Sequence, residues 1–118
     1  MMSSTNNKNR LINSERYNPL KGKTLAVIDA DASSIRKLQK TCKLFQAKLI
    51  IADTEDAVSD TVLAADHVLC YEECPNPRLC EAAYENCALF GKEIHLLENK
   101  SMQNFSSQLA ALSVEVRP

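Results

Sequence analysis

The sequence predicts an α/β fold in which a parallel sheet is covered by helices on both faces. The first observation is that short, β-branched apolar runs alternate with longer amphipathic segments, the pattern of repeated strand and helix units. The second is size and composition, because 118 residues with 45% apolar and 25% charged side chains suffice for one compact domain. The third is that no internal repeat divides the chain.

The folded domain is predicted to cover residues 20–118, after a flexible linker or tail formed by residues 1–19. The leading segment is rich in Asn and Ser and shows no hydrophobic periodicity. The first strand is expected from Thr24 to Ile28, where the residues are apolar and β-branched. A helix should follow, because apolar residues then recur at steps of three and four and align on one face. These residues are Ile35, Leu38, Cys42 and Phe45.

Two further strand and helix pairs follow in the same order. A second strand is expected at 48–52, and then a helix at 55–64 whose first turn carries carboxylates suited to the positive end of the helix dipole. The third strand is expected at 67–71. An acidic loop leads to Asn76, a predicted N-cap with proline at the first helical position, and Gly91 should end that helix.

The last elements complete the predicted topology. They are a strand at 93–97, a helix from about Ser101, and a fifth strand made of Val114, Glu115 and Val116. This order corresponds to a flavodoxin-like (CheY-like) doubly wound parallel sheet of order 2-1-3-4-5, with the last helix missing or truncated. In such a sheet, functional side chains gather outside the carboxyl ends of the strands.

Five residues stand at those carboxyl ends and form the candidate site. Asp29 and Asp31 follow the first strand, and Tyr71 ends the third. Glu98 follows the fourth strand, and Arg117 follows the fifth. Asp29 and Asp31 suit the capping of the helix that follows at least as well as they suit the binding of a metal ion.

The segment from Pro19 to Asp29, PLKGKTLAVID, resembles the opening of a receiver domain from a hybrid sensor histidine kinase. The resemblance is good as far as Pro75 and holds in outline beyond it. Receivers hold Mg²⁺ with two acids after the first strand and take up phosphate on an aspartate at the end of the third. A hydroxyl group after the fourth strand and a lysine after the fifth complete the family's machinery.

The chain departs from this family at the residues that carry the chemistry. Asp29 matches the first acid, Ala30 stands at the second position, and Asp31 is displaced by one. Tyr71 stands at the acceptor position, and a phenol with an ordinary pKa near 10 is a poor nucleophile at neutral pH. The hydroxyl and lysine positions fall on Glu98 and Arg117.

The resemblance therefore implies a non-catalytic pseudo-receiver like those of BarA/GacS-type hybrid kinases, which regulates its kinase through protein contacts and needs no cofactor. Its partners would be the dimerisation or phosphotransfer helices of the kinase, or a neighbouring receiver. Receivers commonly present the first helix to such partners, and here that helix has a basic face suited to an acidic partner. The face consists of Arg36, Lys37, Lys40 and Lys43.

Two other functions stay open from the sequence. One is sensing of a small, quinone-like ligand on the same fold, as the resemblance to the pseudo-receiver of the circadian input kinase implies, with a pocket near Tyr71, Cys74 and Asp29. The other is phosphate uptake on Asp29 or Asp31. An enzyme is not expected, because a chain with two glycines has no glycine-rich phosphate loop, and no nucleophile elbow is present.

Composition and cysteine usage restrict the partners and the compartment. A formal net charge of −1 gives no basis for non-specific nucleic-acid binding, and no apolar run is long enough to insert into a membrane. Five cysteines without Cys-x-x-Cys spacing predict reduced thiols in the cytoplasm, with Cys74 as the exposed and reactive one. A metal site is not expected, because zinc ligands usually pair within a tight turn, and these cysteines are spread over a strand and a helix. They are Cys70, Cys74, Cys80 and Cys87.

Overall fold

Strands and helices alternate along the chain as the sequence predicts. The computed structural model describes residues 18–115. The first three strands and the second helix have the predicted bounds, whereas the fourth strand begins one residue later than expected. The elements are β1 (Thr24–Ile28), α2 (Ala32–Leu44), β2 (Lys48–Ala52), α3 (Glu55–Ala64), β3 (His67–Tyr71), α4 (Pro77–Phe90), β4 (Ile94–Leu97) and α5 (Met102–Glu115).

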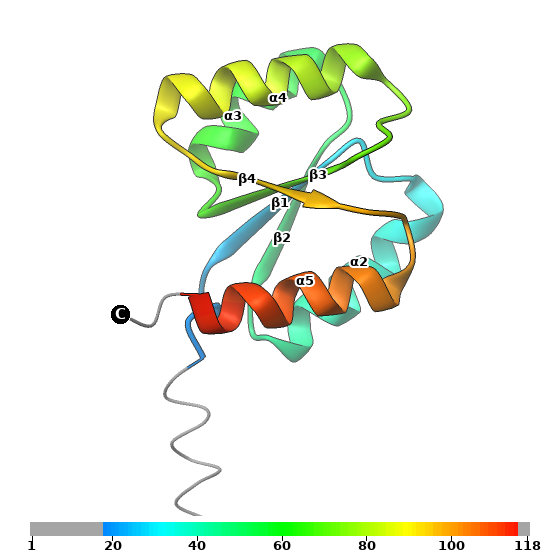
Figure 1. Ribbon diagram of the computed structural model, residues 1–118, viewed down its shortest axis with the longest axis vertical. Coiled ribbons are helices and arrows are strands. Elements are labelled where there is room, and N and C mark those ends of the chain that lie inside the picture. Colours follow the sequence, from blue (N-terminus) through cyan, green and yellow to red (C-terminus); the bar gives the residue numbers. More distant parts are fainter. Residues whose placement is uncertain (1–17, 116–118) are drawn as a thin grey trace, which may run out of the picture.

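The four strands form one parallel sheet between two layers of helices. The strand order is β2-β1-β3-β4. Helices α3 and α4 cover one face, and α2 and α5 cover the other (Figure 1). Successive side chains of a strand point to opposite faces, so Leu69 and Tyr71 of β3 join the core under α2 and α5, while Val68 and Cys70 join the core under α3 and α4.

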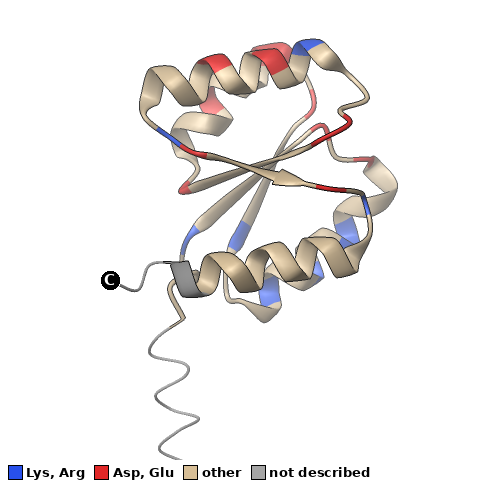
Figure 2. Cartoon of the chain, viewed as in Figure 1, with Lys and Arg blue, Asp and Glu red and all other residues tan. Residues whose placement is uncertain are grey.

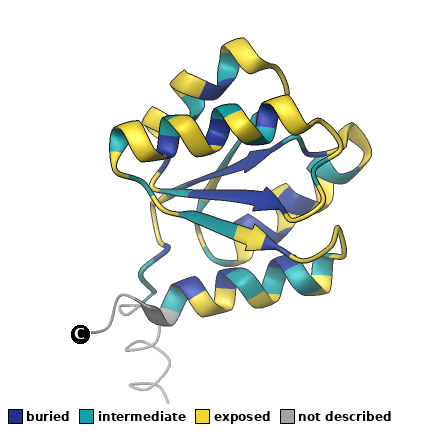
Figure 3. Cartoon of the chain, turned by 45° about the horizontal axis from the view of Figure 1, so that its top comes forward, coloured by how far each residue is buried: buried dark blue, intermediate teal, exposed yellow. Residues whose placement is uncertain are grey.

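Burial follows this layered plan and marks the edges of the sheet. The two central strands are buried, whereas the outward faces of the helices and part of the edge strand β4 are exposed (Figure 3). Within residues 18–115, no helix combines the length and the apolar character that a membrane span requires. The strand order leaves β2 and β4 as the two edge strands of the described sheet.

Helix ends form where the sequence supplies capping groups. The Thr54 hydroxyl accepts a hydrogen bond of 3.3 Å from the Ala57 backbone N–H and starts α3. The Asn76 side chain accepts one of 3.1 Å from the Arg78 N–H at the start of α4. Gly91 ends α4 with a φ of 69°, in the left-handed region that glycine adopts without steric cost.

The folded part begins slightly earlier than predicted. Leu20 is fully buried in the core under α2 and α5. Asn18, which the sequence assigned to the linker, donates a hydrogen bond of 2.8 Å from its side chain to the Phe45 carbonyl. These contacts join the segment before β1 to the end of α2. The rest of the predicted linker, residues 1–17, lies outside the described part of the chain.

The predicted fifth strand is wrong. Helix α5 continues through Glu115, so Val114 and Glu115 are helical, and Val116 lies outside the described residues. Moreover, α5 packs beside α2 (Figure 1). A right-handed connection from β4 to a fifth strand beside it would need its helix on the opposite face, with α3 and α4. Helix α5 therefore belongs to the layer of α2.

Candidate functional site

Tyr71 lies at the carboxyl end of β3, near the acidic residues that follow β1. It is 4% exposed and packs in the same cluster as Leu97 and Phe105. Burial raises the pKa of the Tyr71 phenol, and the negative charges of Asp31 and Asp29 raise it further. The phenol is thus kept neutral and covered, and its ring offers a ligand almost no surface.

Asp29 bends the chain at the end of β1. Its φ is 62°, a left-handed conformation that aspartate tolerates better than most residues. Its backbone N–H donates a hydrogen bond of 2.7 Å to the Ala52 carbonyl at the end of β2. The Asp29 carboxylate accepts a hydrogen bond of 2.9 Å from the backbone N–H of Asn76. This acid is therefore turned toward the loop between β3 and α4.

Asp31 is turned to another partner. It occupies the N-cap position of α2, but its side chain makes no capping hydrogen bond. Its carboxylate instead forms an ion pair of 3.3 Å with the ammonium of Lys100, which belongs to the loop between β4 and α5. The same ammonium lies 5.6 Å from the centroid of the Tyr71 ring, within the range of a cation–π contact.

The two acids face different partners, unlike those of a receiver-type magnesium site. A divalent cation of this kind needs carboxylate oxygens that converge on one point. Here Asp29 is held by the loop after β3, and Asp31 is held by Lys100. Tyr71 supplies no carboxylate at the third position, and the two acids of the site have separate partners.

Sequence reasoning missed Lys100. The family resemblance directed attention to a cation after a fifth strand, at Arg117, which lies outside the described residues. Lys100 follows β4, and the carboxyl ends of parallel strands such as β4 and β1 lie at the same end of the sheet. A search of every loop at that end for charged residues could have identified Lys100. Glu98, assigned to the hydroxyl position, is exposed, and its backbone N–H donates a hydrogen bond of 2.9 Å to the Asn104 side chain.

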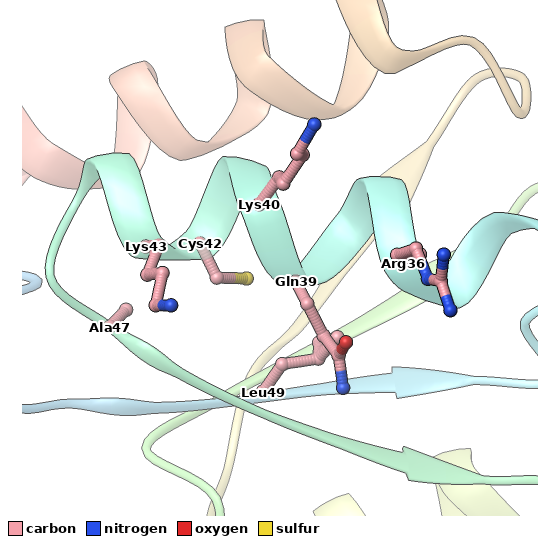
Figure 4. Close-up of a pocket in the computed structure, with 7 residues that line it drawn as sticks. All are labelled: Arg36, Gln39, Lys40, Cys42, Lys43, Ala47 and Leu49. Carbon is pink, nitrogen blue, oxygen red and sulfur yellow. The ribbon is translucent and has the colours of Figure 1, made fainter.

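A basic surface lies on α2, away from the strand ends. The four predicted cations are all exposed, and α2 contains no acidic residue (Figure 2). A groove of about 350 Å³ runs beside them between α2 and the edge strand β2 (Figure 4). Leu44, 81% exposed, adds an apolar side chain at the end of this helix. The groove is lined by Arg36, Gln39, Lys40, Cys42, Lys43, Ala47 and Leu49.

The prediction of a free, reactive Cys74 is wrong. Cys74 is half-buried and forms a disulfide with Cys80, which contradicts the expected reduced thiols as well. The loop after β3 folds back over the first turn of α4 and brings the two residues together, an approach that a separation of six residues does not reveal. The free cysteines of residues 18–115 are buried. They are Cys42, Cys70 and Cys87.

Comparison with known proteins adds support for the fold class alone. No protein-family model matches the sequence, and no curated protein matches it. Among solved structures, a hydroxyethylthiazole kinase protein from Pyrococcus horikoshii OT3 is similar over 90% of this chain, with a TM-score of 0.54 and 15% identity. The chain spans 43% of the length of that protein. At this identity the likeness shows an α/β fold and carries no information on activity.

Proposed function

We propose that this chain is a non-catalytic pseudo-receiver, a regulatory and docking module of two-component phosphorelay signalling. In this proposal it belongs to the cytoplasmic part of a hybrid sensor histidine kinase. The observation that carries the proposal is the arrangement around Tyr71, in which a buried phenol stands at the acceptor position and the two acids of β1 have separate partners.

The topology supports the proposal up to β4. An order of β2-β1-β3-β4 is the receiver order without its fifth strand. The crevice between β1 and β3, where the helices that follow lie on opposite faces, is the place where such sheets carry their sites. Tyr71, Asp29 and Asp31 all stand at that crevice. We therefore propose a CheY-like fold for this domain and a role without catalysis.

A module that cannot accept phosphate must act through contact, and the basic face of α2 is the surface best suited to it. Four exposed cations without an intervening acid favour a partner with negative charge. Exposed Leu44 and the groove along β2 can receive apolar side chains. We assign this surface to an acidic, helical segment of the kinase, within its histidine-bearing dimerisation helices.

Charge reversal on α2 tests this assignment. The affinity of the chain for the histidine-bearing helices of the kinase would be measured by calorimetry, with Lys40→Glu compared with Arg78→Glu. Both variants change the charge equally, but Arg78 lies on α4 in the other helical layer and is 80% exposed. Lys40→Glu should weaken binding by about tenfold or more and reduce its dependence on salt. Equal affinities for the two variants would refute docking through α2.

The sensing of a quinone-like ligand stays a prediction. Tyr71 is 4% exposed and Cys74 is held in a disulfide, so two of the three residues expected near its pocket offer little free surface. A ligand at this place would have to displace the ion pair between Lys100 and Asp31. No specific contact favours this function over docking.

A further inference from the structure

Three cysteine sulfur atoms meet on the side of the sheet covered by α3 and α4. Cys70 lies in β3 and is fully buried, Cys74 lies in the following loop, and Cys80 lies in the first turn of α4. Their sulfur atoms are all within 4.8 Å of one another, and those of Cys70 and Cys80 are 3.0 Å apart. The disulfide joins Cys74 and Cys80, and the sulfur atom of Cys70 lies in contact with it as a third member of the cluster.

We propose that the reduced form of the chain binds one Zn²⁺ through Cys70, Cys74 and Cys80, with the Asp29 carboxylate as the fourth ligand. This inference goes beyond the proposed function and does not depend on it. Zinc prefers four ligands in a tetrahedron, and three thiolates with one oxygen are a suitable set. Two of the three cysteines lie in regular elements, Cys70 in β3 and Cys80 in α4, which hold their sulfur atoms in place.

The distances suit zinc once the disulfide is opened. Zinc to sulfur bonds of about 2.3 Å place two sulfur ligands about 3.8 Å apart, and a sulfur and an oxygen ligand about 3.5 Å apart. Cys70 and Cys80 lie 3.0 Å apart, and Cys74 Sγ lies 3.8 Å from the nearer Asp29 oxygen. Apart from the opening of the disulfide, adjustments of about an ångström bring the three sulfur atoms to these separations, whereas the Asp29 carboxylate, which lies outside the group of atoms within 4.8 Å of one another, has to turn further toward Cys70 and Cys80.

Asp29 is held in place for this role. The backbone N–H of Asn76 donates to the same carboxylate oxygen that faces Cys74, and such outer contacts orient metal ligands. Asn76 is also the N-cap of α4, so the positive end of that helix faces the cluster and favours its negative charge. The Asp29 carboxylate therefore lies beside the Cys74 sulfur atom in a fixed orientation.

The metal-bound and disulfide forms exclude each other. Two molecules of a low-molecular-weight thiol can reduce the Cys74–Cys80 disulfide, become joined in one external disulfide, and leave a thiol on each cysteine. Zn²⁺ then replaces the protons of the three thiols, so three protons leave as one cation binds. Zinc occupancy would therefore report the thiol redox state around the protein.

Metal titration of the reduced chain tests the proposal. The chain is reduced with a phosphine, freed of reductant without air, and titrated with Co²⁺ and then Zn²⁺ while thiolate-to-cobalt absorption is recorded. We expect one equivalent of Co²⁺ to give the spectrum of a tetrahedral thiolate site, and Zn²⁺ to displace it. The oxidised chain should bind neither ion. Absence of cobalt-thiolate absorption in the reduced chain would overturn the proposal.

Variants assign the ligands. Cys74→Ser should weaken Zn²⁺ binding about 100-fold or more, and Asp29→Asn about tenfold. Cys87→Ala is the matched control, because Cys87 lies in α4 but outside the cluster, and it should leave the affinity unchanged. Circular dichroism checks that each variant is folded. Unchanged affinity in Cys74→Ser would refute the site, and unchanged affinity in Asp29→Asn would refute the fourth ligand.

Discussion

The two helical layers of this small domain differ in charge and in sulfur content. Helix α2 carries four cations and no acid, whereas α3 carries three acids and α4 carries two against one arginine (Figure 2). The layer of α2 contains one cysteine, and the core beneath α3 and α4 holds or borders the other four. One sheet thus supports a surface suited to charged contact on one side and a cluster suited to sulfur chemistry on the other.

Two buried thiols, Cys42 and Cys70, illustrate the difference between the two helical layers. Burial raises the pKa of Cys42 and of Cys70 to about 11 in each case. Cys42 lies on the inner side of α2 and packs among apolar side chains of the core, with no second cysteine among the described residues of its cluster. Cys70 lies 3.0 Å from the Cys80 sulfur and can take part in exchange or metal binding. The difference comes from their neighbours, since their burial is similar.

The largest expected effect tests whether α5 belongs to the layer of α2. Phe105→Ala removes a fully packed side chain of α5 and should lower the free energy of unfolding by about 3 to 5 kcal/mol. Leu89→Ala, at a position 74% exposed on α4, should change it by less than about 0.5 kcal/mol. Urea denaturation measures both. Similar values for the two variants would mean that α5 does not cover the sheet.

A smaller effect is expected in the pH dependence of stability, and it comes from Cys42, the thiol of the α2 layer. The pKa of Cys42 is raised from 9.0 to about 11, so folding favours the neutral thiol. Its contribution is fully present below pH 9 and is lost as pH rises through 11. Between pH 9 and pH 11, the free energy of unfolding of the wild type should fall by about 2 to 3 kcal/mol more than that of Cys42→Ala. Urea denaturation at several pH values measures both. Parallel pH profiles for the two proteins would show that Cys42 is accessible to water.

The smallest of these effects concerns the disulfide on the other layer. Opening the Cys74–Cys80 link, which closes a short loop, should lower the free energy of unfolding by about 2 kcal/mol when a chelator keeps metal away. The measurement is urea denaturation with and without a phosphine reductant. A Cys74→Ser, Cys80→Ser double variant serves as the control and should not respond. A wild-type protein equally insensitive to reductant would argue that the link does not form in solution.

Local signals in the sequence predicted most of the fold. The strand bounds followed from β-branched apolar runs, and Asn76 and Gly91 marked the ends of α4 through capping chemistry that acts within a few residues. The fifth strand failed because Val114 and Val116 have strand propensity, although the apolar period of α5 extends to Leu112 and the helix continues past it. Phe105, Leu109 and Leu112 hold α5 against the sheet, and the helix continues through Val114 despite its strand propensity.

The candidate site was predicted only in part, because its partners come from distant segments. The sequence identified Tyr71, Asp29 and Asp31 but gave no sign that the two acids would have different partners. Lys100 lies 69 residues from Asp31, and Cys80 reaches Cys74 only through the path of a loop. Such pairings depend on how loops cross the sheet edge, which no local pattern encodes.

The central claim, that this module works without accepting phosphate, is tested most directly by intact-mass measurement after incubation with acetyl phosphate and Mg²⁺. A receiver that keeps its acceptor aspartate serves as the positive control. With Tyr71 buried and neutral and with Asp29 and Asp31 bound to separate partners, we predict that the mass of this chain stays unchanged. The gain of a phosphoryl group mapped to Asp29, Asp31 or Tyr71 would contradict the account.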